Sequence, residues 1–118
     1  MLPRRSRLTR ASDFSLVYRR GRRFRGHGLT LCAYLGSPAN PSCFAVVAST
    51  KVDRRATVRN RLRRVASATM AELWGVLPPQ GLMLVAIVQK GATSATTAEF
   101  RRELGILVAQ LPQVRATL

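Results

Sequence analysis

The sequence is poor in the groups that enzymes use for catalysis or for binding metals. Its 118 residues include five Asp and Glu residues, one histidine and two cysteines. Cys32 and Cys43 lie in apolar segments and do not form a CxxC motif, so we expect two small buried side chains in a reducing compartment. His27 has no partner at a spacing typical of metal ligands. These shortages argue against a metalloenzyme, and the sequence offers no paired carboxylates, Cys–His pair or Ser–His–Asp set.

Long apolar runs are missing as well. No stretch approaches the roughly 20 residues that a membrane-spanning helix needs, so no membrane partner is expected. The first residues, MLPRRSRLTRAS, resemble a transit peptide superficially, but they lack the apolar centre of a secretory signal. We expect residues 1–10 to form a basic arm of the mature protein. With 47% hydrophobic residues, the chain is predicted to form one domain over residues 1–118.

What the sequence has in excess is positive charge. Its 20 Lys and Arg residues give a formal net charge of +15, and eighteen of them are arginine. Nine arginines lie in residues 4–25, and seven basic residues lie in 51–64. Such a field attracts polyanions, so nucleic acid, bound with a steep salt dependence, is the expected partner. An anionic membrane surface is the competing polyanion.

The segment 51–64, KVDRRATVRNRLRR, predicts a basic helix from about residue 57 to 74. One stripe recurs at steps of three and four and is expected to face a core: Val58, Leu62, Val65, Thr69 and Leu73. An amphipathic membrane helix would show a similar stripe. Arg59 and Arg61 flank this stripe, and Asn60, Arg63 and Arg64 lie on the opposite arc. Arginine can bind two phosphate oxygens at once, and no carboxylates are interleaved to pair with these cations within the helix.

The N-terminal half of the chain predicts a helix followed by two strands. Ser12 is expected to cap a helix over residues 13–20 that ends at a left-handed Gly21. Residues 29–35 alternate as a strand, with Leu31 and Ala33 on one face and Tyr34 on the other. After the turn residues 36–41, residues 43–49 are predicted to form a second strand, paired antiparallel in a hairpin.

The C-terminal half predicts a strand and a last helix. Residues 82–88 are continuously apolar, as in a strand buried on both faces. Thr96 and Glu99 predict a capping box, and the following helix places four residues toward the core: Phe100, Leu104, Leu107 and Leu111. The order is α-β-β-α-β-α with a possible extra strand in residues 22–28, and we expect an α/β sandwich of three helices on one sheet.

Four segments of the sequence are similar to motifs of a known protein family. The hexamer RNRLRR at 59–64 resembles the RNR(I/L)(K/R)R signature of the protein subunit of bacterial ribonuclease P. Residues 7–8, 13–14 and 17–18 resemble its N-terminal "RL…DF..VF" helix. STK at 49–51 with RRA at 54–56, and VQKG at 88–91, resemble two further segments. The sequence differs from common members at Thr50 and Gln89, where many carry a cation, at Tyr18, where Phe is common, and in the loop 53–56, where many have a glycine.

The resemblance implies a fold, an activity and partners. The fold is an α+β two-layer sandwich of order α-β-β-β-α-β-α, with a mixed four-stranded sheet, a left-handed β-α-β crossover and a likeness to the second domain of ribosomal protein S5. The activity is endonucleolytic removal of the 5′ leader of precursor tRNA, in the bacterial cytoplasm. The catalytic groups belong to an RNA subunit, and Mg²⁺ is held mainly by that RNA. The partners are this RNA and precursor tRNA, with no obligate protein partner.

The resemblance also implies roles for particular residues. One set is expected to bind the backbone of the RNA subunit: Lys51, Arg54, Arg55, Arg59, Asn60, Arg61, Arg63 and Arg64. Phe14 and Tyr18 are expected to stack on unpaired leader nucleotides, although an ordinary core face would also place aromatics there. Leu31 and Ala33, or alternatively Tyr34, are expected to line the same cleft, and Lys90 is expected to reach a leader phosphate.

Other functions compete with this one. A structural RNA-binding protein, such as a ribosomal component, would use the same basic helix without any leader cleft. A nucleoid or membrane-surface polycation would show no preference for one RNA, and it would not depend on the uncharged Asn60. An independent protein nuclease is disfavoured, because the sequence has no catalytic set.

Overall fold

A strand that is apolar along its whole length lies inside the sheet. The computed structural model describes residues 2–112, except for the side chain of Ser94. In it, β4 (Leu82–Val88) pairs antiparallel with β2 (Leu29–Leu35) and parallel with β3 (Cys43–Val47). The order of the sheet is β1-β2-β4-β3, and the outer strand β1 (Arg22–Arg25) pairs antiparallel with β2. β4 is fully buried on the face toward α2 and α3, but on the α1 face Met83 and Ile87 are half-buried, so the prediction of burial on both faces holds only in part. The extra strand within residues 22–28 is confirmed.

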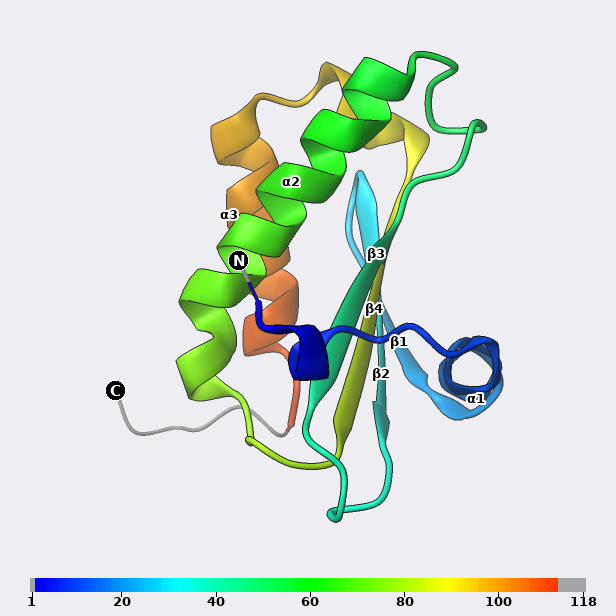
Figure 1. Ribbon diagram of the computed structural model, residues 1–118. Helices are drawn as coiled ribbons and strands as arrows, with labels where there is room; N and C mark the ends of the chain where they lie inside the picture. Colours follow the sequence, from blue (N-terminus) through cyan, green and yellow to red (C-terminus); the bar gives the residue numbers. More distant parts are fainter. Residues whose placement is uncertain (1, 113–118) are drawn as a thin grey trace.

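Helices cover both faces of this sheet. The long basic helix α2 (Ala56–Leu73) and the last helix α3 (Thr97–Ala109) lie on one face, and α1 (Ala11–Arg20) lies alone on the other (Figure 1). Short 3₁₀ turns precede α1 (Arg4–Ser6), follow α2 (Trp74–Val76) and follow β4 (Lys90–Ser94). The chain runs from β3 through α2 to the parallel strand β4, so α2 is the crossover between two neighbouring strands.

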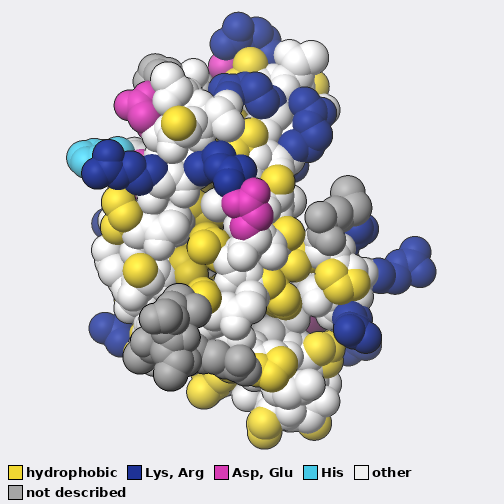
Figure 2. Space-filling model, turned by 90° about the vertical axis from the view of Figure 1, so that its left-hand side faces the viewer, with side chains coloured by type: hydrophobic (Ala, Val, Ile, Leu, Met, Phe, Trp, Pro, Cys, Tyr) yellow, Lys and Arg dark blue, Asp and Glu magenta, His cyan; other side chains and the backbone are white. Residues whose placement is uncertain are grey.

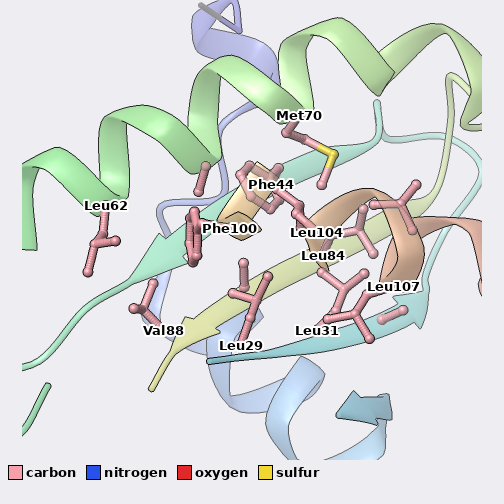
Figure 3. Packing of buried hydrophobic residues seen from close by; sticks show 14 of the residues in the cluster. Leu29, Leu31, Phe44, Leu62, Met70, Leu84, Val88, Phe100, Leu104 and Leu107 are labelled. Carbon is pink, nitrogen blue, oxygen red and sulfur yellow. The ribbon is translucent and has the colours of Figure 1, made fainter. Parts of the chain in front are cut away.

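The larger core lies between the sheet and the helices α2 and α3. Figure 3 shows Leu62 and Met70 of α2 and Phe100 of α3 meeting side chains of the sheet. The predicted core stripe is confirmed, since Phe100, Leu104 and Leu107 of α3, and Leu111 just beyond its end, are at most 3% exposed. On α2 the predicted stripe is completed by Ala66 and Met70, which are fully buried. Thr96 caps α3 as predicted: its hydroxyl accepts from the N–H of Glu99, whose carboxylate accepts from the N–H of Thr96.

The predicted hairpin between residues 29–35 and 43–49 is wrong. β2 and β3 are not neighbours, because β4 lies between them and pairs with both. Turn-rich residues between two strands favour a hairpin locally. Here, however, β2 already pairs with β1 on one side, and β4, the most apolar strand, takes the central position on its other side.

Two predictions about the ends of α1 are also wrong. The helix begins at Ala11, and the N–H groups of Asp13 and Phe14 donate to the carbonyl of Arg10, so Ser12 lies inside the first turn and makes no cap. Gly21 is extended, with φ −73° and ψ 155°, and is not left-handed. Its requirement is space, because a Cβ there would lie 2.3 Å from the carbonyl oxygen of Val17. The chain passes too close to α1 at this point for a side chain.

The basic arm lies along the free edge of β3. Arg7 forms a parallel bridge with Phe44, and the N–H of Leu8 donates to the carbonyl of Phe44 at 3.0 Å. Leu2 is 7% exposed in the core beneath α2 and α3, and Leu8 is 5% exposed in the smaller core beneath α1. Residues 2–10 therefore anchor both layers and partly cover an edge strand.

Candidate nucleic-acid interface

The loop between β3 and α2 holds one arginine in a fixed orientation. The carboxylate of Asp53 accepts from the backbone N–H of Arg55 at 2.8 Å and from its Nε and Nη2 at 3.0 and 2.9 Å. The side-chain hydrogen bonds from Arg55, followed by the backbone one, lower the pKa of Asp53 to about 2. The side chain of Arg55 is still 71% exposed. Lys51 and Arg54, in the same loop, are exposed too.

The arginines at the start of α2 contact the protein as well as solvent. Nη1 of Arg59 donates at 2.9 Å to the carbonyl oxygens of Asp53 and Arg54. Arg63 donates at 2.9 Å to the carbonyl of Ala48 and at 2.7 Å to Oδ1 of Asn60. Because a guanidinium has five N–H donors, each keeps donors for a ligand. These contacts hold the loop against the helix and aim its cations outward.

The remaining groups of the predicted set lie around the same end of α2. Arg61 is half-buried, and its Nη1 is 3.3 Å from the hydroxyl of Thr97 at the start of α3. Asn60 and Arg64 are exposed. Lys and Arg side chains gather at the upper end of the molecule, where α2 begins (Figure 2). The structure therefore brings the predicted RNA-subunit set together at one end of the fold.

The face of the sheet under α1 is only partly covered. On this face the strand register aligns side chains of β2, β4 and β3 in three rows. From one end of the strands to the other, the rows are Tyr34–Met83–Cys43, Cys32–Val85–Ala45 and Thr30–Ile87–Val47. Cys32 and Val85 in the middle are fully buried, whereas most of the outer members are half-buried. An apolar floor therefore remains partly open beside α1.

Phe14 and Tyr18 lie beside this floor. Their ring centroids are 6.2 Å apart with an interplanar angle of 44°, and both rings are half-buried. Burial raises the pKa of the Tyr18 hydroxyl; Cys32 adds to this and Arg23 opposes it. Tyr34 packs in the same cluster. The structure thus brings three predicted aromatic residues to one surface.

The alternative that placed Leu31 and Ala33 in the cleft is wrong. Side chains alternate along β2, so these two residues lie on the opposite face, in the core beneath α2 and α3, at 0% and 8% exposure. Of the two faces that the sequence left open, the structure places the Tyr34 face beside α1.

Lys90 lies close to the basic loop. Val47 of β3 pairs with Ile87 of β4, so the residues after these strands run side by side. A shallow hollow results, lined by Ser49, Lys51, Val52, Val88, Gln89 and Lys90. Lys51 and Lys90 are both exposed at its rim. The hollow therefore joins the basic loop to the end of β4.

Most of the apolar floor beside α1, and the arginines that border it at the N-terminal arm, could not be predicted from the sequence. A groove between α1, the N-terminal arm and the start of β3 is lined by Arg5, Arg7 and Arg10 together with Tyr34, Cys43 and Met83. Burial and the nearby Asp13 raise the pKa of the Cys43 thiol to about 11, so it contributes a neutral surface. Alternation within residues 43–47 and 82–88 was the available signal, but it identifies this floor only once the sheet order is known.

Within residues 2–112 no group of three His, Cys, Asp or Glu side chains is arranged to hold a metal ion. We assign no metal-dependent step to these side chains. No helix in the same range is long and apolar enough to cross a membrane.

Comparison with known proteins gives consistent matches. The family described as Ribonuclease P matches residues 2–112. The ribonuclease P protein component of Microcystis aeruginosa is 37% identical over 106 residues, which cover 87% of this chain and 88% of that protein. That of Acidothermus cellulolyticus is 33% identical over 115 residues, covering 98% and 95%.

Solved structures show the same fold. The RNase P protein of Staphylococcus aureus matches with a TM-score of 0.82 at 14% identity, over 93% of this chain and 98% of that one. The RNase P protein of Thermotoga maritima matches with a TM-score of 0.78 at 23% identity, over 91% and 98%. The arrangement of β1 to β4 with α1, α2 and α3 is therefore shared at low sequence identity.

Proposed function

This chain belongs to the ribonuclease P protein family, and from that premise we propose how its surfaces work. It is a subunit of an endoribonuclease, acts in tRNA 5′ processing and has an RNA partner. The end of α2 and its preceding loop bind the catalytic RNA subunit, and the open sheet face beside α1 binds the 5′ leader of precursor tRNA.

The basic end of α2 suits the backbone of a folded RNA. Arg55, Arg59 and Arg63 are held by hydrogen bonds to the protein, so less side-chain entropy is lost when they meet phosphates. Lys51, Arg54, Asn60 and Arg64 are exposed beside them. Neutralising phosphates that the RNA brings close together lowers its demand for Mg²⁺. In this proposal Mg²⁺ and the catalytic groups belong to the RNA.

The sheet face beside α1 suits unpaired nucleotides. The observation that carries this part is the partly open apolar floor with Phe14, Tyr18 and Tyr34 beside it. Bases stack on such rings at roughly 1–3 kcal/mol each, largely without regard to sequence. Lys90 lies at the rim of the hollow beyond this floor, in reach of a leader that continues toward the basic loop. A protein that only braces duplex RNA has no use for an open aromatic floor.

This proposal is tested by how much a leader increases the affinity of the holoenzyme for tRNA. The affinity of the reconstituted holoenzyme is measured for precursor tRNA with a leader of several nucleotides and for mature tRNA. Tyr18→Ala is expected to weaken binding of the leader-bearing RNA by about fivefold or more and to leave mature tRNA unaffected. Tyr18→Phe is the matched control and keeps the leader benefit. Equal losses on both RNAs would show that Tyr18 acts through the fold and not on the leader.

A further inference from the structure

A second group of arginines lies at the sheet edge farthest from β3. Arg19 and Arg20 form the last turn of α1, and Arg22, Arg23 and Arg25 belong to β1. All five are exposed. β1 is separated from β3 by β2 and β4, so this β1-edge group (Arg19, Arg20, Arg22, Arg23 and Arg25) lies about 14 Å across the sheet from β3. It is a surface separate from the end of α2.

The cations of the β1-edge group are not neutralised by the protein. In the part of the chain that the structure describes, the ion pairs are Arg55 with Asp53 and Arg101 with Glu72. None of the β1-edge arginines takes part in them. Arg23 and Arg25 lie on the α1 side of the sheet, as Arg19 and Arg20 do, whereas Arg22 pairs with Ala33 and lies on the other side of the same edge. Exposed cations gathered along one edge repel one another in the free protein. Such an arrangement is stabilised by an anionic partner.

The chemistry of this edge favours phosphate contacts over base stacking. Phe24 is the aromatic residue of β1, and its ring is covered by the guanidinium of Arg22 at 5.3 Å and packs against the core. The ring of Phe24 is therefore not open to stacking by an unpaired base. Guanidinium groups that have no ring for stacking beside them suit the regularly spaced phosphates of an RNA helix, which proteins recognise mainly through its backbone.

The β1-edge group also continues the proposed leader surface. Arg23 and Arg25 pair with Cys32 and Thr30, so their side chains lie on the α1 side of the sheet. Arg23 is near enough to Tyr18 for its charge to oppose the rise in the pKa of the Tyr18 hydroxyl. A nucleic acid that crosses the floor beside α1 therefore meets these cations where it leaves the sheet at β1.

We propose that the β1-edge group is a second RNA-binding site, which contacts the phosphate backbone of a double-stranded RNA segment. This inference rests on the function proposed above, because it assumes that the leader crosses the sheet face beside α1. The duplex comes either from the RNA subunit or from the paired body of precursor tRNA. Both present the same chemistry. An edge strand also carries charges to prevent pairing with another chain, and that role predicts aggregation of the variants with no loss of RNA binding.

The test uses two charge-matched double variants. Arg19→Gln/Arg20→Gln removes two adjacent charges from α1, and Arg101→Gln/Arg102→Gln removes two adjacent charges from α3 on the other face of the sheet. Affinity is measured as a function of salt concentration, first of each protein for the RNA subunit and then of each holoenzyme for mature tRNA. Each lost contact with a duplex phosphate lowers the slope of log K against log salt by about 0.9.

The β1-edge double variant is expected to lower this slope by about 1–2 in one of the two measurements, which identifies the source of the duplex. The α3 double variant is expected to leave both slopes unchanged. Arg23→Gln/Arg25→Gln is a second variant that removes charge from β1 itself. If neither β1-edge variant changes a slope, the inference is overturned, and aggregation of those variants would assign the charges to protection of the edge. Arg61→Ala in the same assays tests the proposed function separately.

Discussion

The guanidinium of Arg63 donates a hydrogen bond of 2.9 Å to the carbonyl oxygen of Ala48, and so ties the first turns of α2 to the end of β3. Ala48 is 3% exposed, and a buried carbonyl without a partner is costly. The same side chain donates to Asn60 at 2.7 Å. Arg63 therefore has a structural contact as well as a proposed role toward RNA, whereas Arg64 next to it is exposed.

Arg63 and Arg64 should differ in their effect on stability. Arg63→Ala is expected to lower the free energy of unfolding by about 1–3 kcal/mol, because it removes a charged donor from a buried carbonyl. Arg64→Ala is expected to change it by about 0.5 kcal/mol or less. Both variants should bind the RNA subunit more weakly. Urea unfolding and RNA binding of the two proteins make the comparison, and equal stabilities would show that the bond to Ala48 contributes nothing.

Asp53 should make stability depend on pH in the acid range. Its pKa falls from the ordinary value of 3.8 to about 2 in the folded protein. A group with a lowered folded pKa stabilises the fold above its unfolded pKa, and this contribution is lost as the pH falls from about 4 through about 2. Asp53→Asn should therefore flatten that part of the profile. NMR titration of the carboxyl group checks the pKa directly, and an ordinary value would mean that the contact with Arg55 does not persist in solution.

Lys90 should act on the leader through charge alone. Lys90→Gln is expected to lower the slope of log K against log salt by about 0.7, the value for a phosphate of a single strand, for leader-bearing precursor tRNA. Mature tRNA should show no change. Arg102→Gln, which removes the same charge from the exposed surface of α3, serves as the control. A similar change with both variants would mean that net charge, and not the position of Lys90, matters.

The capping box of α3 should contribute to stability without contributing to RNA binding. Thr96→Ala removes the acceptor for the N–H of Glu99 and is expected to cost about 1 kcal/mol in the free energy of unfolding. Thr96 lies apart from the proposed leader surface, so affinity for leader-bearing precursor tRNA should stay the same at temperatures where the variant is folded. A thermal scan and one binding measurement check both parts. Lower affinity of the folded variant would connect α3 to the leader surface.

The parts of the fold that depend on nearby residues could be predicted from the sequence. The capping box at Thr96 and Glu99 and the stripe from Phe100 to Leu107 lie within one helix, with Leu111 just beyond its end, and both are confirmed. The pairing of β3 could not be predicted in this way. It depends on β4, which follows β3 by a whole helix, and strand pairing over that distance leaves no local pattern. The space requirement at Gly21 also depends partly on a distant strand, because a Cβ there would lie 3.0 Å from the carbonyl oxygen of Ala33 in β2 as well as 2.3 Å from that of Val17.

In the candidate site, too, the features set by nearby residues could be predicted and those set by distant segments could not. The basic loop and helix could be predicted, since the residues are consecutive and the helical period places them. The protein contacts of Arg59 and Arg63 could not, because their acceptors are backbone carbonyls, which any residue provides. The floor beside α1 required the alignment of Tyr34 with Met83 and Cys43 across three strands.

The most direct test of the account is cleavage of a precursor tRNA by a bacterial ribonuclease P RNA at low Mg²⁺, with and without this protein. We expect the protein to restore cleavage at the correct 5′ position, and the gain should be larger for a substrate with a leader of several nucleotides than for one with a very short leader. Arg61→Ala should reduce the gain for both substrates, and Phe14→Ala should reduce it only for the longer leader. If the protein binds that RNA no better than it binds a random polyanion, and cleavage does not rise, the assignment of these surfaces is contradicted.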